Sequence, residues 1–327
     1  MAANATLDVL SREVDFFRSL CWAPNTQRAY AVHRRAYLQF CNMLGLPPVP
    51  ATSNQLCMYA AYLARRMKYN SIKQYMNIIR ILHLEWQLPS PLSGDFHLQS
   101  TLQGIRRHLG DTVSRKEPIT PQLLLALLSH LDVTTPEGAN TWAAALIMFF
   151  GLLRRSNVLS SNSSPFNPAL HLRRQDLIFT SAGLQLRIRW SKTLQFKQKE
   201  FILPLCRIKR HPLCPTRAAY NAIQLTAGAP RNGPAFVVPH GDTYKPTTAD
   251  RFVHIIKTSL SNHCDTSKIS GHSFRRGGAS WAYASGVPID TIRQLGDWKS
   301  NAYMAYTICN TDSLHKACNA MASTLPT

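Results

Sequence analysis

The stretch from Trp142 to Leu153 constrains the fold of this 327-residue chain more than any other part of it. It carries no charged side chain, and alanine and large apolar residues fill nearly every position. A helix that is apolar on all sides is buried, so other elements must cover it. Arg154 and Arg155 follow at once. Because burying an arginine without a partner is costly, we expect at least one of them to meet an anion.

The charge of the chain points to a polyanionic partner. Lysine and arginine number 37 against 17 acidic residues, which gives a formal net charge of +20. The excess is spread out, with 14 basic and 7 acidic residues in 1–117 and 23 and 10 in 118–327. A positive field of this kind attracts nucleic acid and makes binding salt-dependent. We expect both halves to contact double-stranded DNA; a basic protein that binds no nucleic acid is the alternative.

The eight cysteines lack the tight, even spacing of a small secreted framework. No signal peptide and no apolar run of about 18 residues is apparent, so we expect no membrane association and reduced thiols in the cytosol or nucleus. Cys206, His211 and Cys214 are candidate zinc ligands without a fourth ligand at a fitting distance. We therefore expect structural cysteines and no metal.

The first third of the chain has the spacing of amphipathic helices. An apolar stripe marks the first helix, and capping residues mark the later ones. The stripe consists of Leu7, Leu10, Val14, Phe17 and Leu20 over 5–21; further helices begin at Asn25 or Thr26, at Thr52 or Ser53, and at Asn70, and the last covers 96–109. Residues 111–118 are polar and end in proline, which predicts a linker between domains at 1–110 and 119–327.

The second domain begins with Thr120 and Pro121, a good cap and first helical residue. Residues 184–189 alternate like a strand, and 201–205 are the expected partner strand. Helices are predicted at about 216–227, 247–262, 273–285 and 288–295 from the apolar spacing. The fold class is therefore mainly α with a small β-sheet.

A second cluster of motifs carries the chemistry. His272 and Arg275 are three residues apart in the run Gly-His-Ser-Phe-Arg-Arg-Gly-Gly, so on a helix they share one face and can hold one phosphate. Trp298 and Tyr306 follow, and Lys192 lies between the two predicted strands. A tyrosine hydroxyl could then attack the bound phosphate.

The order Arg154, Lys192, His272, Arg275, Trp298, Tyr306 resembles the catalytic set of the tyrosine recombinase (phage integrase) family. The resemblance covers nearly the whole chain. The amino-acid sequences of 150–157 and 295–300 are most similar to those of eukaryotic mobile-element recombinases of the Crypton or DIRS/Ngaro type. It implies a helical, SAM-like core-binding domain followed by an α-rich mixed catalytic domain. It also implies cleavage and rejoining of DNA through a 3′-phosphotyrosine, without metal, ATP or another cofactor.

The resemblance implies a role for each residue of the set. Arg154 and Arg275 would clamp the phosphate, and Arg155 and Arg276 are their neighbouring alternatives. His272 would bind the phosphate or take the proton of Tyr306, Trp298 would donate its indole N–H, and Lys192 would protonate the leaving 5′ oxygen. The alternative is that these residues have structural roles only: His272 as a hydrogen-bonded core histidine, Trp298 as a core tryptophan and Lys192 as a solvated loop lysine.

Two positions leave the assignment open. Tyr306 lies eight residues after Trp298, one short of the family's usual spacing, and Tyr303 is the alternative nucleophile. Asn157 stands where many relatives carry an acid that supports the active site. We expect a change there to tune activity.

Partners follow from the same resemblance. Basic side chains of the first domain are candidate phosphate contacts: Arg28, Arg34, Arg35, Arg65, Arg66, Lys68, Lys73 and Arg80. A C-terminal helix over 312–321 would pass to a neighbouring protomer and build a tetramer on DNA, or cap its own domain. A DNA substrate implies the nucleus. The competing functions are a domesticated DNA-binding descendant that no longer cuts and a type IB topoisomerase-like enzyme.

Overall fold

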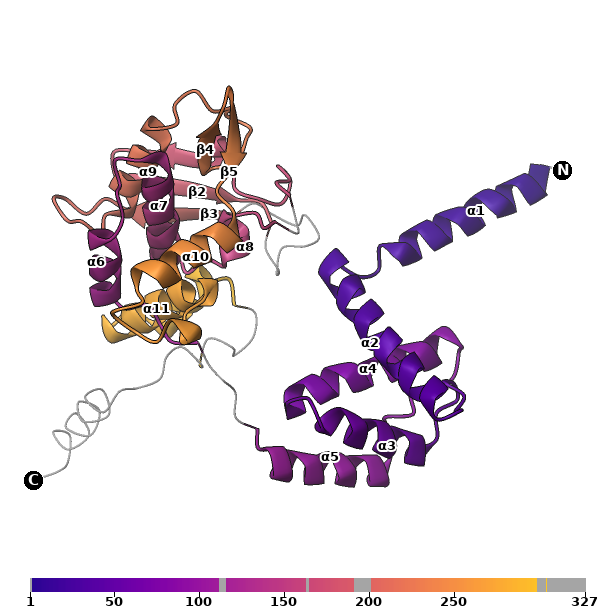
Figure 1. Cartoon of the computed structure of the whole chain (residues 1–327). Helices are drawn as coiled ribbons and strands as arrows, with labels where there is room; N and C mark the ends of the chain where they lie inside the picture. Colours follow the sequence, from indigo (N-terminus) through magenta and orange to yellow (C-terminus); the bar gives the residue numbers. More distant parts are fainter. Residues whose placement is uncertain (1, 112–115, 163–164, 191–200, 299–303, 305–327) are drawn as a thin grey trace, which may run out of the picture. The chain divides into compact units, whose positions relative to one another are not determined.

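The computed structural model describes residues 2–111, 116–162, 165–190, 201–298 and 304 (Figure 1). The chain divides into two compact units, Met1–Ser114 and Arg115–Thr327. Each unit has its own hydrophobic core. Lys192, Tyr303, Tyr306 and the predicted helix at 312–321 lie outside the described residues.

The first unit is helical in all its described elements: α1 (Ala2–Ser19), α2 (Pro24–Met43), α3 (Ser53–Ala64), α4 (Tyr69–Glu85) and α5 (Phe96–Leu109). The predicted cap at Thr52 is confirmed, because its hydroxyl accepts a hydrogen bond from the backbone N–H of Gln55 at 3.3 Å. Asn70 does not begin α4, which starts one residue earlier after Lys68. Helix α2 packs on α4, and α3 packs on α4 and α5, around a core that includes Tyr37 and Tyr59.

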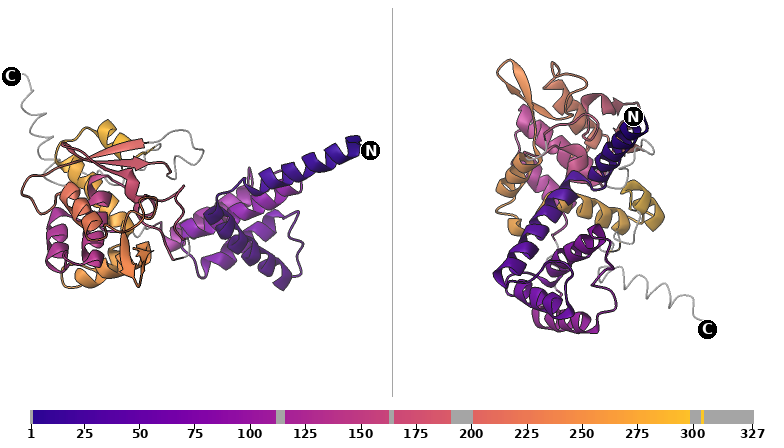
Figure 2. Two further views of the ribbon diagram at one scale, coloured as in Figure 1. Left: turned by 90° about the horizontal axis from the view of Figure 1, so that it is seen from above. Right: turned by 90° about the vertical axis from the view of Figure 1, so that its right-hand side faces the viewer.

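The second unit is mixed: α6 (Pro121–Ser129), α7 (Pro136–Phe150), α8 (Arg155–Val158), a 3-10 helix (Arg174–Asp176), β1 (Leu177–Phe179), β2 (Gly183–Ile188), β3 (Phe201–Cys206), α9 (Pro215–Gln224), β4 (Val237–His240), β5 (Thr243–Pro246), α10 (Ala249–Ser259), a 3-10 helix (Thr266–Lys268), α11 (Gly271–Ala284) and α12 (Ile289–Leu295). The predicted buried helix is α7, every residue of which from Gly138 to Phe149 is buried. Helices α9 and α11 and strand β4 pack around it (Figures 1 and 2).

The predicted strand pair is confirmed as β2 and β3, which are antiparallel with Leu186 opposite Leu203 and Ile188 opposite Phe201. Strand β1 adds to the other edge of β2, and β4 and β5 form a separate hairpin. Neither β1 nor this hairpin was predicted, because each strand has only three or four residues and too little alternation to stand out. The mainly helical fold with small sheets is confirmed.

Helix α11 approaches its neighbours through two glycines. A Cβ on Gly277 would lie 1.8 Å from the carbonyl oxygen of Ile119, and one on Gly278 would lie 1.9 Å from that of Phe149. Only hydrogen fits at these distances, so the pair lets α11 touch the end of α7 and the segment before α6. This contact sets the position of Arg275, which lies on the same helix.

Among the described residues, no helix combines the length and apolarity that a membrane span requires. In the same part of the chain, no three histidine, cysteine or acidic side chains converge as metal ligands would.

Candidate active site

Arg275 is the best-defined member of the predicted set. Its side chain is 3% exposed, and its guanidinium donates to the carbonyl oxygens of Leu152 at 2.5 Å and Gly296 at 2.6 Å. Both carbonyls lie at the C-terminal ends of helices, α7 and α12, where the helix dipole favours a cation. Neutral carbonyls fix the guanidinium without cancelling its charge.

Trp298 lies against the same guanidinium. The guanidinium carbon of Arg275 is 3.9 Å from the centroid of the Trp298 ring, and this tryptophan is 8% exposed. The backbone makes room for the ring, since a Cβ on Gly296 would lie 1.9 Å from a carbon of the indole. Asp297, between them, has a φ of 51°, which turns the chain so that the Gly296 carbonyl and the indole both reach Arg275. The Trp298 ring therefore serves as a stacking platform.

The sequence suggested that Arg154 lies at the end of the buried helix, but the structure places it beyond that end. Leu152, which follows the C-cap of α7 at Gly151, has a φ of 48°, and Arg154 caps the separate short helix α8. The left-handed conformation of Leu152 has two effects. It points the Leu152 carbonyl at Arg275, and it changes the direction of the chain before Arg154. The side chain of Arg155, the first residue of α8, packs against Gly271, where a Cβ would leave no room for it.

Asn157 joins Arg154 to the sheet. Its side-chain oxygen accepts from the backbone N–H of Arg154 at 3.2 Å, and its side-chain nitrogen donates to the carbonyl of Trp190 at 3.1 Å. Asn157 is 4% exposed. The sequence marked this position only as a departure from relatives, whereas the structure gives its amide two distinct tasks. An ionised carboxylate could accept the first bond but could not donate the second.

Arg154, Asn157 and Arg275 line one small cavity, together with Leu153, Ile188, Phe201, Leu295, Gly296 and Asp297. The alternatives lie elsewhere: Arg155 is absent from this lining, and Arg276 donates to the carbonyl of Lys116 at 2.7 Å. Residues more than a hundred positions apart in the chain thus meet where the sheet ends and three helix termini converge. Two arginines that line one cavity can supply donors suited to an oxyanion.

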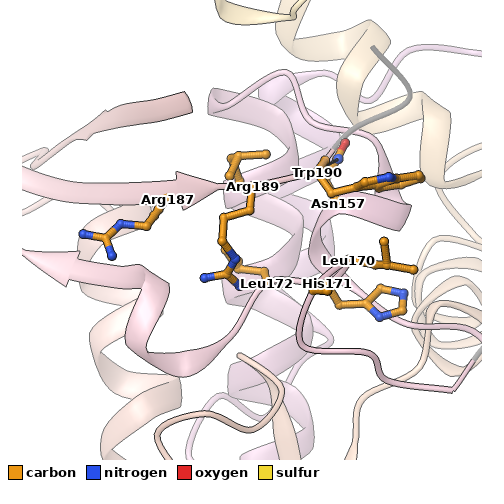
Figure 3. A pocket seen from close by; sticks show the side chains of 9 residues that line it. Asn157, Leu170, His171, Leu172, Arg187, Arg189 and Trp190 are labelled. Carbon is orange, nitrogen blue, oxygen red and sulfur yellow. Dashed lines mark hydrogen bonds between the residues drawn. The ribbon is translucent and has the colours of Figure 1, made fainter. Parts of the chain in front are cut away.

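An ion-pair network holds the end of β2 beside this cavity. Arg189 donates to both oxygens of Asp176, at 2.6 and 2.8 Å, and Arg173 donates to them at 3.1 Å. The Asp176 side chain is fully buried. Figure 3 shows a neighbouring pocket, whose lining includes Asn157, Trp190, Arg189 and Arg187. No sequence signal marked Asp176, which precedes the unpredicted β1.

His272 lies on the first turn of α11, as predicted, and its side chain is exposed. Ser270 caps the helix, since its hydroxyl accepts from the backbone N–H of His272 at 3.3 Å, while Ser273 accepts from the N–H of Ser270 at 3.0 Å. The helix therefore begins sharply, and its positive N-terminal end lies at His272. Lys192 and both candidate tyrosines remain predictions outside the described residues.

The candidate DNA contacts of the first unit differ in their surroundings. Arg35, Arg65, Arg66 and Lys68 are exposed. Arg34 is partly buried and pairs with Glu85 at 2.5 Å. Three others have contacts within their own helices: Arg28 with Asn25, Arg80 with Asn77, and Lys73 over the Tyr69 ring. Arg106, near the end of α5, also lies over this ring and pairs with Asp111 at 2.7 Å; the sequence analysis did not select it.

Known proteins resemble the chain in sequence and in fold. It is 26% identical over 299 residues to an integrase/recombinase xerD homolog of Selenomonas ruminantium, a match that covers 85% of this chain and 79% of the relative. The Tn1549 transposon integrase, solved in complex with transposon right end DNA, matches with a TM-score of 0.65 and 16% identity over 92% of this chain and 95% of that chain.

Lambda integrase, solved as a dimer bound to a COC′ core site, matches with a TM-score of 0.60 and 14% identity over 91% of this chain and 94% of that chain. No protein-family model matches. The solved structures show that the fold is that of the tyrosine recombinases, as the motifs predicted.

Proposed function

We propose that this chain is a site-specific tyrosine recombinase that cleaves and rejoins strands of double-stranded DNA through a 3′-phosphotyrosine intermediate. The observation that carries the proposal is the cavity lined by both Arg154 and Arg275. Two forked cations around one small space are the arrangement that a transferring phosphoryl group needs as its oxygens gain charge. The relatives named above, which include integrases in complex with DNA, support the same substrate.

In the proposed reaction, the hydroxyl oxygen of Tyr306 attacks the phosphorus of a DNA phosphodiester. A bond forms between that oxygen and phosphorus as the bond to the 5′ oxygen breaks. The proton of Tyr306 passes to His272 or to water, and Lys192 gives a proton to the departing 5′ oxygen. The new ester conserves the energy of the phosphodiester, so attack by a 5′ hydroxyl of another strand reverses the chemistry without ATP.

The described residues contribute charge and position. Arg275, anchored by two backbone carbonyls and the Trp298 ring, presents a guanidinium of fixed direction. A preorganised charge pays little reorganisation cost during the reaction. Arg154 is positioned through its own backbone by Asn157, which also binds the strand end that leads toward Lys192. His272, at the exposed start of α11, is suited to contact a phosphate from solvent.

The finer parts of the proposal concern biological setting. We infer a recombinase carried by a mobile element of the Crypton or DIRS/Ngaro type, because the sequence around Arg154 and Trp298 resembles that of such recombinases. It would act in the nucleus as a tetramer on DNA, with the C-terminal segment exchanged between protomers. Each of the two proposed domains, 1–110 and 119–327, would contact DNA.

Covalent trapping tests the proposal. The full chain is incubated without metal on nicked suicide duplexes drawn from a mixed library of candidate element ends. The parent is compared with Tyr306→Phe and Tyr303→Phe. Tyr220→Phe is the matched control, since Tyr220 is an exposed tyrosine on α9 of the same unit and is 53% accessible.

An adduct that disappears only in Tyr306→Phe supports the proposed nucleophile. Loss of the adduct only in Tyr303→Phe would identify Tyr303 as the nucleophile and leave the proposed reaction class unchanged. Tight, salt-sensitive binding without any adduct would overturn the catalytic proposal in favour of a DNA-binding protein that does not cut.

A further inference from the structure

Helix α1 carries an apolar surface that the rest of the described chain leaves uncovered. Every side chain from Thr6 to Leu20 is exposed. Leu7 is 69% accessible, Leu10 53% and Phe17 65%. In Figure 1 the helix runs out from the start of α2, and α1 has no extended packing against any other described element. A contiguous apolar surface of this kind marks an interaction site.

The spacing of the apolar residues identifies the kind of partner. Leu7, Leu10, Val14 and Phe17 alternate at intervals of three and four residues, which places them at successive a and d positions of a heptad. Such a seam is buried by another helix that carries the same seam. A second copy of α1 supplies one.

The charges beside the seam select a parallel arrangement. With Leu7 at position a, Glu13 falls at g and Arg18 at e of the next heptad. In a parallel pair, each g residue faces the e residue five positions later on the partner helix, so Glu13 meets Arg18 twice. In an antiparallel pair, g faces g and e faces e, which would set like charges against each other. Within its own helix, Arg18 makes an exposed contact to Asp15 at 3.8 Å, which contributes little stability and can be exchanged for a partner across the pair.

We propose that α1 is a self-association element: two copies of this chain join through a parallel α1–α1 coiled coil before they meet DNA. The association does not depend on the proposed catalytic function. It would place two protomers together on one recombination site with a single binding event, because linked binding units engage DNA at a high effective concentration.

Sedimentation equilibrium of the full chain without DNA tests the association. We expect a reversible dimer that Leu10→Ser weakens by about 100-fold, because a buried seam leucine is lost. Val9→Ser is the matched control, since it removes an adjacent apolar residue outside the seam and should change the dissociation constant by less than about threefold.

Charge exchange tests the orientation. Glu13→Lys and Arg18→Glu should each weaken the dimer by about tenfold, and the double variant should restore it to within about threefold. Arg12→Glu, which makes the same charge change on the opposite face of the helix, should have no effect. Circular dichroism checks that α2–α5 stay folded in each variant.

A chain that remains monomeric at the highest soluble concentration would overturn the proposal. So would a dimer that tolerates Leu10→Ser, because it would use another surface. Single variants that weaken the dimer without rescue in the double variant would overturn the parallel register. None of these results bears on covalent trapping, so the two proposals fail independently.

Discussion

The guanidinium carbon of Arg275 lies 3.9 Å from the ring centroid of Trp298, and both side chains are nearly inaccessible to solvent. A cation over an indole face at this distance is attracted by the ring quadrupole, most strongly when the pair is shielded from water. The same guanidinium holds the ends of α7 and α12 through the Leu152 and Gly296 carbonyls. The proposed clamp is therefore also a structural joint.

Variants of Trp298 should separate stacking from hydrogen bonding. Trp298→Ala removes a buried ring and should lower the free energy of unfolding by about 3–5 kcal/mol. Trp298→Phe keeps a ring under Arg275 and should cost less than about 1.5 kcal/mol. If the indole N–H binds the phosphate, adduct formation by Trp298→Phe should still fall roughly 10-fold or more. Thermal unfolding and covalent trapping are the two measurements; unchanged trapping in Trp298→Phe would leave the tryptophan with packing alone.

Asn157→Asp should produce a pH-dependent loss of stability. An ionised aspartate would place a negative oxygen against the Trp190 carbonyl, at a cost of about 1–3 kcal/mol. Burial and this repulsion would raise the folded-state pKa of the new carboxyl above its unfolded value. The deficit should therefore be full above the folded pKa and shrink as pH falls toward the unfolded pKa, where the protonated acid can donate to Trp190. Unfolding curves at pH 4.5, 6 and 8 check this; a pH-independent deficit would contradict it.

Asp176→Asn should be strongly destabilising, because it leaves the partly buried Arg173 and Arg189 guanidiniums without their buried, charged partner. We expect a loss of about 3–5 kcal/mol in the free energy of unfolding. Glu137→Gln is the control, since it breaks the exposed Glu137–Arg251 pair and should cost about 0–1 kcal/mol.

Hydrogen bonds from Arg251 lower the pKa of Glu137. Its small stabilisation is therefore present above the unfolded pKa, near 4.5, and is lost as pH falls below it. Equal losses in Asp176→Asn and Glu137→Gln at neutral pH would show that the buried network contributes no more than a surface pair.

Gly278→Ala should disturb the site from a distance. The added methyl group would meet the Phe149 carbonyl, so α11 must move away from α7 and carry Arg275 with it. We expect a loss of about 3 kcal/mol or more, together with reduced trapping. Gly104→Ala is the matched control, because Gly104 lies inside α5 with open space around its Cα; it should stabilise the chain by about 0.5–1 kcal/mol. A neutral Gly278→Ala would show that the helices separate freely.

The salt dependence of DNA binding should distinguish exposed from paired arginines. The double change Arg65→Ala and Arg66→Ala should reduce the slope of log K against log salt by about 2, since each removes one phosphate contact. Arg34→Ala should change it less, because Arg34 already pairs with Glu85. DNA titrations at several salt concentrations measure both slopes. A larger effect at Arg34 would show that Arg34, and not Arg65 and Arg66, contacts the phosphates.

Periodicity and capping determined several elements without help from the fold. The apolar run around Ile147 predicted a helix buried on all sides because no face of it could favour water, and α7 is that helix. Alternation predicted the β2–β3 pair, and a threonine before proline predicted the start of α6. The spacing predicted that His272 and Arg275 share one face if both lie on a helix; α11 holds both, because it begins two residues before the predicted start at 273.

The partners of the site residues were decided only by tertiary structure. Arg275 is bound by the carbonyl of Leu152, which is 123 residues away, and every residue in the chain carries such a carbonyl. Side-chain identity therefore gave no sign of this contact. Asn157 was visible as an unusual residue, but its two hydrogen bonds depend on where α8 and β2 end. The sequence thus determined which chemical groups are available, and the packing of α7, α11 and α12 determined which of them meet, because the long-range approach of backbones is set by the shape of the whole core.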